Sequence, residues 1–339
     1  MKKIVLYILK YLVGFGIAAL LIWWSVHKLT PKDISDIKAA LLRARFWLLI
    51  PVAIVLLLSH WFRALRWKQL IMPMGHAPST VRLLCGLLIG YIGNQLVPRA
   101  GEILRCTSIA QTEKIPAEKL IGTMVAERAF DMLCLALITL GTVIMEYQYM
   151  QSYVTEIYTT LRTNLLTGGA KRWWLLLIAV ALITGLVILY KRSSNHKAGK
   201  FIRSVMKGLL EGLSSIRIVQ NKPLFILNPV LIWRCYGLST WLGCFALEET
   251  GRLPLSTAVT MLVFGTFGII VAPGGLGAYP IAIQKTLGFY GIGENIGLAS
   301  GWILWLAQFI FTMISGTIAW FVIQSLNKSV GEKRSTHPA

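Results

Sequence analysis

Residues 86–105 read GLLIGYIGNQLVPRAGEILR and decide the fold. An apolar stretch from about 81 to 97 overlaps this segment and is interrupted by glycines. It is shorter than the roughly 20 residues that a helix needs to cross a bilayer. A second stretch of the same form runs from about 255 to 272. Short apolar segments that end in Gly and Pro at corresponding places in two halves are typical of discontinuous or re-entrant membrane helices. We therefore predict two re-entrant helices, whose turns contain Pro98, Gly101, Pro273, Gly274, Gly275 and Gly277.

The rest of the 339-residue chain is apolar enough to fill a membrane. Apolar residues make up 55% of it and charged residues 14%, whereas soluble domains carry roughly 25% charged residues. The sequence predicts an all-α integral membrane protein, one domain over residues 1–339, with about six full transmembrane helices and the two re-entrant ones. The six full spans are expected at about 5–26, 46–66, 118–146, 171–191, 224–247 and 297–325.

Basic residues fix the expected orientation of the spans. Residues 191–223 carry eight Lys or Arg against one acid, so the positive-inside rule places this connection in the cytoplasm. That placement follows if both short stretches turn back without crossing and both chain ends are cytoplasmic. Residues 67–80 and 99–117 then lie inside and 147–170 outside. Residues 27–45 fit less well, because they would lie outside while carrying five Lys or Arg.

The same arrangement divides the chain into two halves. Residues 46–146 run span, re-entrant helix from the cytoplasmic side, span, and residues 224–325 run span, re-entrant helix from the outside, span. The two halves are thus predicted to form an inverted repeat, which is a transporter architecture. The pattern of segments carries this prediction, since few residues are identical between the halves.

Ionisable residues at membrane depth cost several kcal/mol unless they are paired or hydrated, so each one is a functional candidate. The densest group runs from Asn94 to Asp131. Glu127 and Asp131 are four apart and share a helix face, where they would hold Arg99, Arg105 or Arg128. One interpretation is a polar cavity with a guanidinium available to an anionic headgroup, because the planar fork of Arg suits phosphate. The alternative is that the charges, including Glu102, only brace the turn.

Three further cations need an explanation. Arg63 and Arg66 stand beside Trp67 at the end of a span, where either interfacial anchoring or headgroup contact explains them. Arg234 lies near the middle of the 224–247 span without an accompanying acid, which favours a functional role. The candidate substrate-binding residues are Arg99, Glu102, Arg105, Glu127, Arg128, Asp131, Asn94, Arg63, Arg66 and Arg234.

Several classes of function find no support in the sequence. The chain has three Asp, and its five Cys show no CxxC spacing, so no metal site or disulfide framework is expected. Residues 274–277 do not continue into a P-loop, and no catalytic motif or cofactor is predicted. The net charge of +20 in an apolar chain indicates basic cytoplasmic loops and not a nucleic-acid binder. Gly86 and Gly90 form a GxxxG pair, which permits close helix packing within one chain or in a homo-oligomer.

Four motifs together resemble a known family. They are Asn94-xxx-Pro98-Arg99-Ala100-Gly101-Glu102-xx-Arg105, Glu127-Arg128-xx-Asp131, Arg63-xx-Arg66-Trp67 and Pro273-Gly274-Gly275-Leu276-Gly277. The chain resembles the lysylphosphatidylglycerol synthase transmembrane-region family, the flippase-like domain of multiple peptide resistance factors. The resemblance implies a bacterial inner-membrane protein of the flippase type, whose best-understood relatives move aminoacylated phosphatidylglycerol between leaflets. It also implies that the charged residues of the first two motifs correspond to the family's charged motif residues.

The chain departs from that pattern in two ways. No synthase domain follows the last span, so lipid synthesis is not expected. Pro280 stands where the family's second turn usually has a Glu, so no acidic role carries over to it. We expect a flippase-type transporter that moves a phosphate-bearing lipid, aminoacylated or polyprenyl-linked, and whose partners are anionic membrane lipids. The alternatives are an integral membrane transferase acting on a lipid phosphate, and a non-transporting accessory subunit of an envelope complex.

Overall fold

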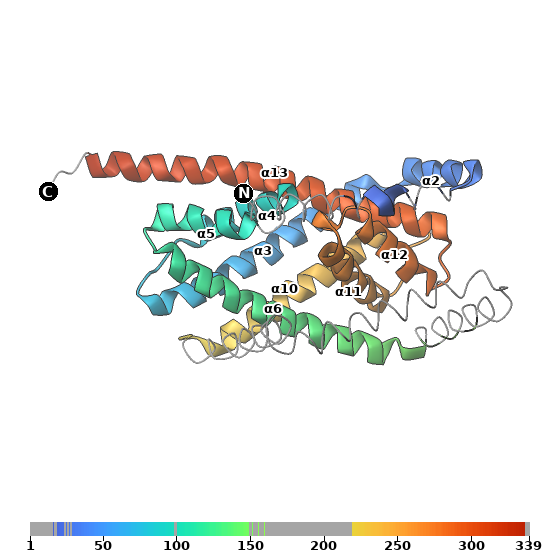
Figure 1. Cartoon of the computed structure of the whole chain (residues 1–339), viewed down its shortest axis with the longest axis horizontal. Helices are drawn as coiled ribbons and strands as arrows, with labels where there is room; N and C mark the ends of the chain where they lie inside the picture. Colours follow the sequence, from blue (N-terminus) through green and yellow to red (C-terminus); the bar gives the residue numbers. More distant parts are fainter. Residues whose placement is uncertain are drawn as a thin grey trace, which may run out of the picture. The chain divides into compact units, whose positions relative to one another are not determined.

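The computed structural model describes residues 29–97, 100–148 and 219–335, with isolated positions at 16, 19–23, 25, 27, 151, 155 and 159 (Figure 1). This part of the chain is helical and contains no strand. Contacts divide the chain into two compact units, residues 1–127 with 215–339 and residues 128–214, and each is described by itself. The elements are α2 (Pro31–Arg43), η1 (Phe46–Leu48), α3 (Leu49–Ile71), η2 (Met72–Met74), α4 (Thr80–Leu96), α5 (Ala100–Glu113), α6 (Ala117–Met145), α10 (Lys222–Cys244), α11 (Leu255–Val271), η4 (Pro273–Gly275), α12 (Ala278–Gly288) and α13 (Glu294–Ser335).

Three described segments are long and apolar enough to cross a membrane: Phe46–Met74, Ala117–Met145 and Glu294–Asn327. They coincide with three of the predicted spans. The predicted span 224–247 is the helix α10, which does not reach the same apolarity. The predicted spans 5–26 and 171–191 and the basic connection 191–223 lie wholly or largely outside the described residues. The chain is therefore an all-helical membrane protein, and the count of six full and two re-entrant helices stays a prediction.

The outward faces of the long helices are apolar. On α13, Leu306, Ile310, Ile314 and Ile318 are between 44% and 57% exposed and follow one another at intervals of one turn. Soluble monomers rarely expose contiguous apolar patches of this kind, whereas lipid covers such a stripe in a membrane. The opposite side of α13 is narrow, because Gly301 lies against Pro280 of α12 and Gly316 against Ile92 of α4.

Each short apolar stretch is the first arm of a helical hairpin. The 17-residue helix α4 is followed by α5, 14 residues long, and the 17-residue α11 by α12, 11 residues long. Most of residues 99–117, which we expect on the cytoplasmic side, form the return arm α5, which packs on α4. Their side of the membrane stays a prediction. The sequence did not reveal this arm because it is rich in polar residues such as Glu102, Thr107 and Gln111.

Glycines on the first arm set the spacing of both hairpins. A Cβ atom at Gly101 would lie 1.7 Å from the carbonyl oxygen of Gly90, so the backbones of α4 and α5 touch there. In the second hairpin, a Cβ at Gly268 would lie 2.9 Å from Cα of Tyr279. The predicted GxxxG pair Gly86 and Gly90 thus packs within the chain, against α5.

The tips of the two hairpins meet. Gly274, at φ 60°, lies against the side-chain amide of Gln95 in the last turn of α4. The indole N–H of Trp305 on α13 donates a 2.8 Å hydrogen bond to the carbonyl oxygen of Gly274. Gly275 and Gly277 also have positive φ, which a residue with a Cβ adopts only with strain. The glycine-rich turn is therefore the joint at which both hairpins contact each other and α13.

The helices before, within and after each hairpin follow in the same order along the chain. The order α3, α4, α5, α6 is repeated as α10, α11, α12, α13, and α3 and α10 are both 23 residues long and pack against each other. Both first arms end alike, with the N–H of Val97 bonded to Gly93 and that of Ala272 to Gly268. The inverted repeat itself stays a prediction, for which this correspondence is the structural basis.

We predict that Gly101→Ala destabilises the protein. The methyl group has no room against Gly90, and overpacking of this kind costs about 1–3 kcal/mol. The control is Gly122→Ala on α6, where nothing lies within 4 Å of a Cβ and helix propensity favours Ala. The thermal melting point of the detergent-purified protein should fall for the first variant and hold or rise for the second. Equal melting points would contradict the tight contact.

Candidate functional site

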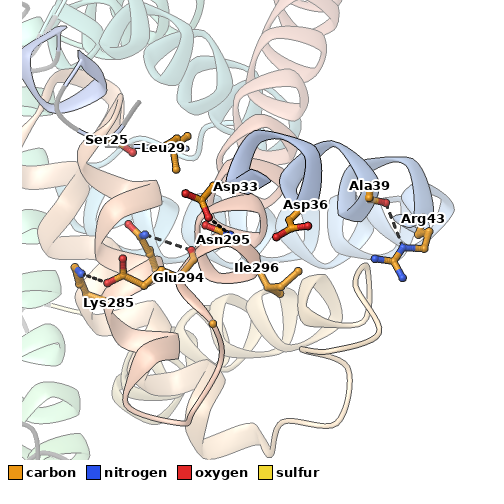
Figure 2. A pocket seen from close by; sticks show the side chains of 12 residues that line it. Ser25, Leu29, Asp33, Asp36, Ala39, Arg43, Lys285, Glu294, Asn295 and Ile296 are labelled. Carbon is orange, nitrogen blue, oxygen red and sulfur yellow. Dashed lines mark hydrogen bonds and ion pairs between the residues drawn. The ribbon is translucent and has the colours of Figure 1, made fainter. Parts of the chain in front are cut away.

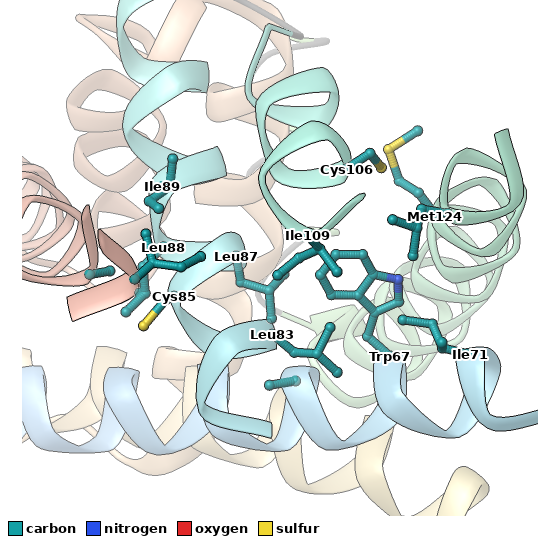
Figure 3. Packing of buried hydrophobic residues seen from close by; sticks show 14 of the residues in the cluster. Trp67, Ile71, Leu83, Cys85, Leu87, Leu88, Ile89, Cys106, Ile109 and Met124 are labelled. Carbon is teal, nitrogen blue, oxygen red and sulfur yellow. The ribbon is translucent and has the colours of Figure 1, made fainter. Parts of the chain in front are cut away.

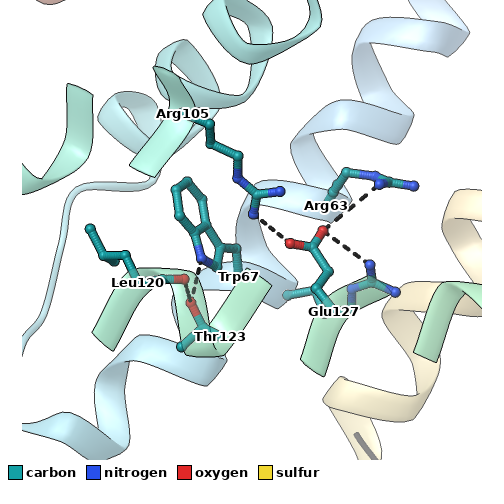
Figure 4. A network of polar contacts seen from close by, with 7 residues as sticks. Arg63, Trp67, Arg105, Leu120, Thr123 and Glu127 are labelled. Carbon is teal, nitrogen blue, oxygen red and sulfur yellow. Dashed lines mark hydrogen bonds and ion pairs between the residues drawn. The ribbon is translucent and has the colours of Figure 1, made fainter. Parts of the chain in front are cut away.

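The charged centre of the larger unit is the carboxylate of Glu127. Its side chain is 1% exposed and is reached by guanidinium groups from two other helices (Figure 4). Arg66 Nη2 donates a 3.0 Å hydrogen bond to Oε1, and Arg63 Nη1 lies 3.9 Å from the same oxygen. Arg105 donates from Nη2 to Oε2. Three arginines therefore converge on one carboxylate, and we call these four side chains the Glu127 cluster.

The local sequence explains how each arginine reaches this place. Arg63 and Arg66 are three residues apart on α3 and hence lie on one face of it. Arg105 lies one helical turn after Gly101, the residue that brings α5 into contact with α4. The relative exposures of Arg63, Arg66 and Arg105 are 6%, 1% and 3%. The cluster is thus enclosed by protein, and the glycine contact is what positions its α5 member.

Trp67 forms one wall of the cluster. The guanidinium carbon of Arg105 lies 3.7 Å from the centroid of a Trp67 ring, which is a cation–π geometry. The Trp67 indole donates a 2.9 Å hydrogen bond to Oγ1 of Thr123, whose hydroxyl donates to the carbonyl oxygen of Leu120. Trp67 also packs in the main apolar core (Figure 3), which contains Ile71, Leu83, Leu87, Cys106, Ile109, Leu120 and Met124. The charges therefore border a tightly packed apolar region.

The chemistry of the cluster favours an anion. Its three guanidiniums present charge-assisted hydrogen-bond donors in one enclosed place. Nε of Arg105 is buried and has no hydrogen-bond acceptor within the described part of the chain. A buried donor without an acceptor costs roughly 1–3 kcal/mol, which an oxygen of a bound anion would offset.

The structure brings some predicted site residues together. Arg105 and Glu127 pair, as one of the expected pairings had it. Arg63 and Arg66 turn inward to the same carboxylate, so their side chains are not in the position of interfacial anchors. Asn94 has a bracing contact, because its Oδ1 accepts a 3.0 Å hydrogen bond from the N–H of Gly101.

The other predicted site residues lie elsewhere or are not described. Glu102 is partly exposed in the first turn of α5. Arg234 is exposed on α10. Arg128 and Asp131 follow Glu127 on α6 and belong to the second unit. Pro98 and Arg99 lie outside the described residues.

Sequence reasoning missed two members of the site. The sequence explains Trp67 and the two Arg beside it equally well by interfacial anchoring and by headgroup contact, so it does not single out Trp67 as a site residue. Thr123 gave no signal, since a lone Thr in an apolar helix commonly bonds to its own backbone. It does so here as well, and in addition accepts the hydrogen bond from the Trp67 indole.

A second polar region surrounds a pocket of about 620 Å³ between α2, α12 and the start of α13 (Figure 2). Lys285 pairs with Glu294 across it, and Asn295 donates a 2.7 Å hydrogen bond to Asp33. The bonds from Asn295 and from Thr30 hold the pKa of the exposed Asp33 below its ordinary value. These contacts fasten α2 to α13. No group of three metal-ligating side chains occurs among the residues that the structure describes.

The chain has relatives among known proteins. The family described as lysylphosphatidylglycerol synthase TM region matches residues 11–316. The chain belongs to this family. It is also similar to a protein from Methanothermobacter thermautotrophicus (strain Delta H) named UPF0104 membrane protein, with 25% identity over 300 residues, 79% of this chain and 80% of that one. No solved structure matches the chain.

We predict that replacing Glu127 by Leu lowers stability strongly in this member of the lysylphosphatidylglycerol synthase TM region family. Removing one partner of a buried ion pair costs about 3–5 kcal/mol, because the remaining charge stays buried. Glu118→Leu is the matched control, since Glu118 is exposed in the first turn of the same helix. Thermal unfolding in detergent, followed by near-ultraviolet circular dichroism, separates the two. A Glu127→Leu protein that melts like the Glu118→Leu protein would show that the guanidiniums find other compensation.

Proposed function

We propose that the protein is a flippase-type transporter that moves a phosphate-bearing lipid between membrane leaflets. The observation that carries the proposal is the Glu127 cluster, an enclosed set of three guanidiniums around one carboxylate inside an apolar helical bundle. An arginine at membrane depth costs about 3 kcal/mol on insertion scales. Three of them converge on one enclosed place, where their hydrogen-bond donors suit an anionic ligand.

A lipid phosphate has the chemistry that this cluster accepts. Guanidinium forks bind phosphate oxygens by parallel, charge-assisted hydrogen bonds. Arg105 offers the buried Nε donor that lacks an acceptor among the described residues, and the Trp67 ring fixes its plane. Aminoacylated and polyprenyl-linked lipids both present such a phosphate.

The hairpins supply a structural basis for movement. Their tips touch at Gly274 and Gln95, so each hairpin blocks part of the route through the bundle. If each enters the membrane from its own side, then displacing one tip opens the site to one leaflet while the other stays closed. The first hairpin, which contributes Arg105, would act as the cytoplasmic gate and the second as the outer gate.

The proposed orientation follows the predicted charge distribution. Both chain ends would lie in the cytoplasm of a bacterial cell, and the protein would span the inner membrane. The start of α6, with its exposed Lys119, would then be cytoplasmic, whereas α2, with its exposed Lys38, would lie outside. Anionic lipids at the cytoplasmic surface would gather near the basic loops.

We expect Arg105→Gln to slow lipid movement. The purified protein is reconstituted in liposomes with fluorescent phosphatidylglycerol, and a membrane-impermeant reductant reports the leaflet in which the label lies. Losing a charged hydrogen-bond donor to phosphate, at about 1.5–3 kcal/mol, should lower the rate about ten- to a hundredfold. Arg82→Gln is the control, because Arg82 pairs with Glu113 outside the cluster.

A labelled glucosylceramide, which lacks phosphate, tests the class of substrate. The wild-type protein should move it no faster than protein-free liposomes do. If wild-type protein moves neither lipid, or if Arg105→Gln moves phosphatidylglycerol as fast as wild type, the proposed function is wrong.

Single cysteines test the orientation. The five native cysteines are buried or partly buried, so a cysteine-free background with Lys38→Cys or Lys119→Cys presents one exposed thiol. A membrane-impermeant maleimide added to intact spheroplasts should label Lys38→Cys at once. It should label Lys119→Cys only after the membrane is permeabilised. The reverse pattern would invert the orientation, and with it the assignment of the two gates.

A further inference from the structure

The carboxylate of Glu127 occupies the place in the cluster that an anionic ligand needs. Both of its oxygens take hydrogen bonds from arginines, Oε1 from Arg66 and Oε2 from Arg105. A phosphate that binds these same donors must compete with the carboxylate for them. Two anions that share one set of guanidiniums also repel each other, which favours the neutral form of the carboxyl group.

We infer that Glu127 is a proton-binding counter-ion, so that a lipid phosphate enters the cluster together with one proton. This inference rests on the proposed function and adds the coupled ion to it. In the empty site, ionised Glu127 holds the arginines. When the phosphodiester arrives, it takes the guanidinium donors, and the Glu127 carboxylate takes a proton from water. No other covalent bond forms or breaks, and release of the lipid returns the proton.

Charge conservation at the site supports this exchange. Carboxylate and phosphodiester each carry one negative charge, so binding a phosphodiester with a proton leaves the formal charge of the buried cluster unchanged. Binding it without a proton would leave two anions, the carboxylate and the phosphodiester, sharing one enclosed set of guanidinium donors. The proton therefore lets the arginines exchange one anionic partner for another, and a transmembrane proton gradient would then bias the direction of transport.

Other titratable groups lie near enough to need separate tests. Arg63 and Arg66 face Glu127 from α3, and Arg105 faces it from α5. Arginines stay charged in proteins. Cys106 follows Arg105 in the buried core. Asp131 comes one turn after Glu127 on α6 and belongs to the second unit, and Glu102 is partly exposed on α5.

His60 is the strongest rival for the proton. It is 8% exposed on α3, one turn before Arg63, between the rings of Tyr91 and Phe311. Its Nδ1 has no hydrogen-bond partner within the described part of the chain. A proton on His60 would add a positive charge beside Arg63 and would not free any guanidinium. Protonation of Glu127 removes the negative charge to which Arg66 and Arg105 donate, and His60 supplies the matched control.

The experiment counts protons during ligand binding to the purified full-length protein. Dihexanoyl phosphatidylglycerol, a water-soluble lipid, is titrated calorimetrically at neutral pH in two buffers that differ in heat of ionisation. The difference in observed heat gives the number of protons taken up per lipid. We expect about one proton, and an affinity that weakens about tenfold for each unit of rising pH across the range where uptake is complete. Inorganic phosphate is titrated in parallel to distinguish a free anion from a lipid headgroup.

Variants assign the proton. Glu127→Gln should bind the lipid with no proton uptake and with little dependence on pH. His60→Gln and Asp131→Asn should keep the wild-type count of about one. A full proton count in Glu127→Gln, or its loss in His60→Gln, would overturn the assignment to Glu127.

The wild-type titration is decisive even if Glu127→Gln does not fold. Lipid binding without proton uptake overturns the coupling and leaves the proposed function standing. Absence of any lipid binding overturns both. Phosphate binding that equals lipid binding in affinity and proton count would keep the coupling and replace the lipid by a free anion.

Discussion

Burial of three guanidinium groups around one carboxylate is the constraint on which the first half of this protein depends. Glu127 can hold Arg63, Arg66 and Arg105 only if α3, α5 and α6 approach within side-chain reach of one another. That approach in turn requires α5 to lie directly on α4, through the contact of Gly101 with Gly90. The Glu127 cluster thus depends on the glycine contact. The glycine contact sets the distance between the helices, and a change in that distance would leave charges of the cluster buried without their partners.

The second hairpin has the same frame and a different interior. Its arms also meet through glycine, at Gly268 against Tyr279, but the surrounding core consists of residues such as Met261, Ile283 and Leu304. The polar contacts described at its turn and between its arms and α13 include two neutral ones, the Trp305 indole bonded to the turn and Gln308 donating to the Tyr279 hydroxyl, while its ion pair of Lys285 with Glu294 is exposed. The two hairpins therefore share a shape while the buried charge belongs to one of them. If substrate recognition and gating were divided between the two hairpins, buried charge would be confined to one of them in this way.

Much of this arrangement could be predicted from the sequence, and what could not has identifiable causes. Pro98, Pro273 and the glycines beside them mark both turns, because few other residues permit the chain to reverse there. The return arm α5 was missed because a helix that faces both an apolar core and a polar cluster has no clean apolar run. Arg63 and Arg66 could not be assigned, since an arginine at the end of a span has the same sequence whether it points outward to headgroups or inward to Glu127. The pairing of Arg105 with Glu127 was among the expected alternatives, and three-dimensional contact was needed to select it.

The long helix α13 has a consequence for how the molecule can move. Gly297 and Gly301 lie against α12, and Gly316 lies against α4, so one continuous helix touches both hairpins along its length. At these contacts α13 itself contributes no side chain, so nothing on α13 there interlocks with the hairpins and blocks their displacement along it. Displacement of one hairpin along α13 would change the contact at Gly274 and thereby displace the other hairpin. The helix α13 is thus the element that both hairpins contact and relative to which each of them would move.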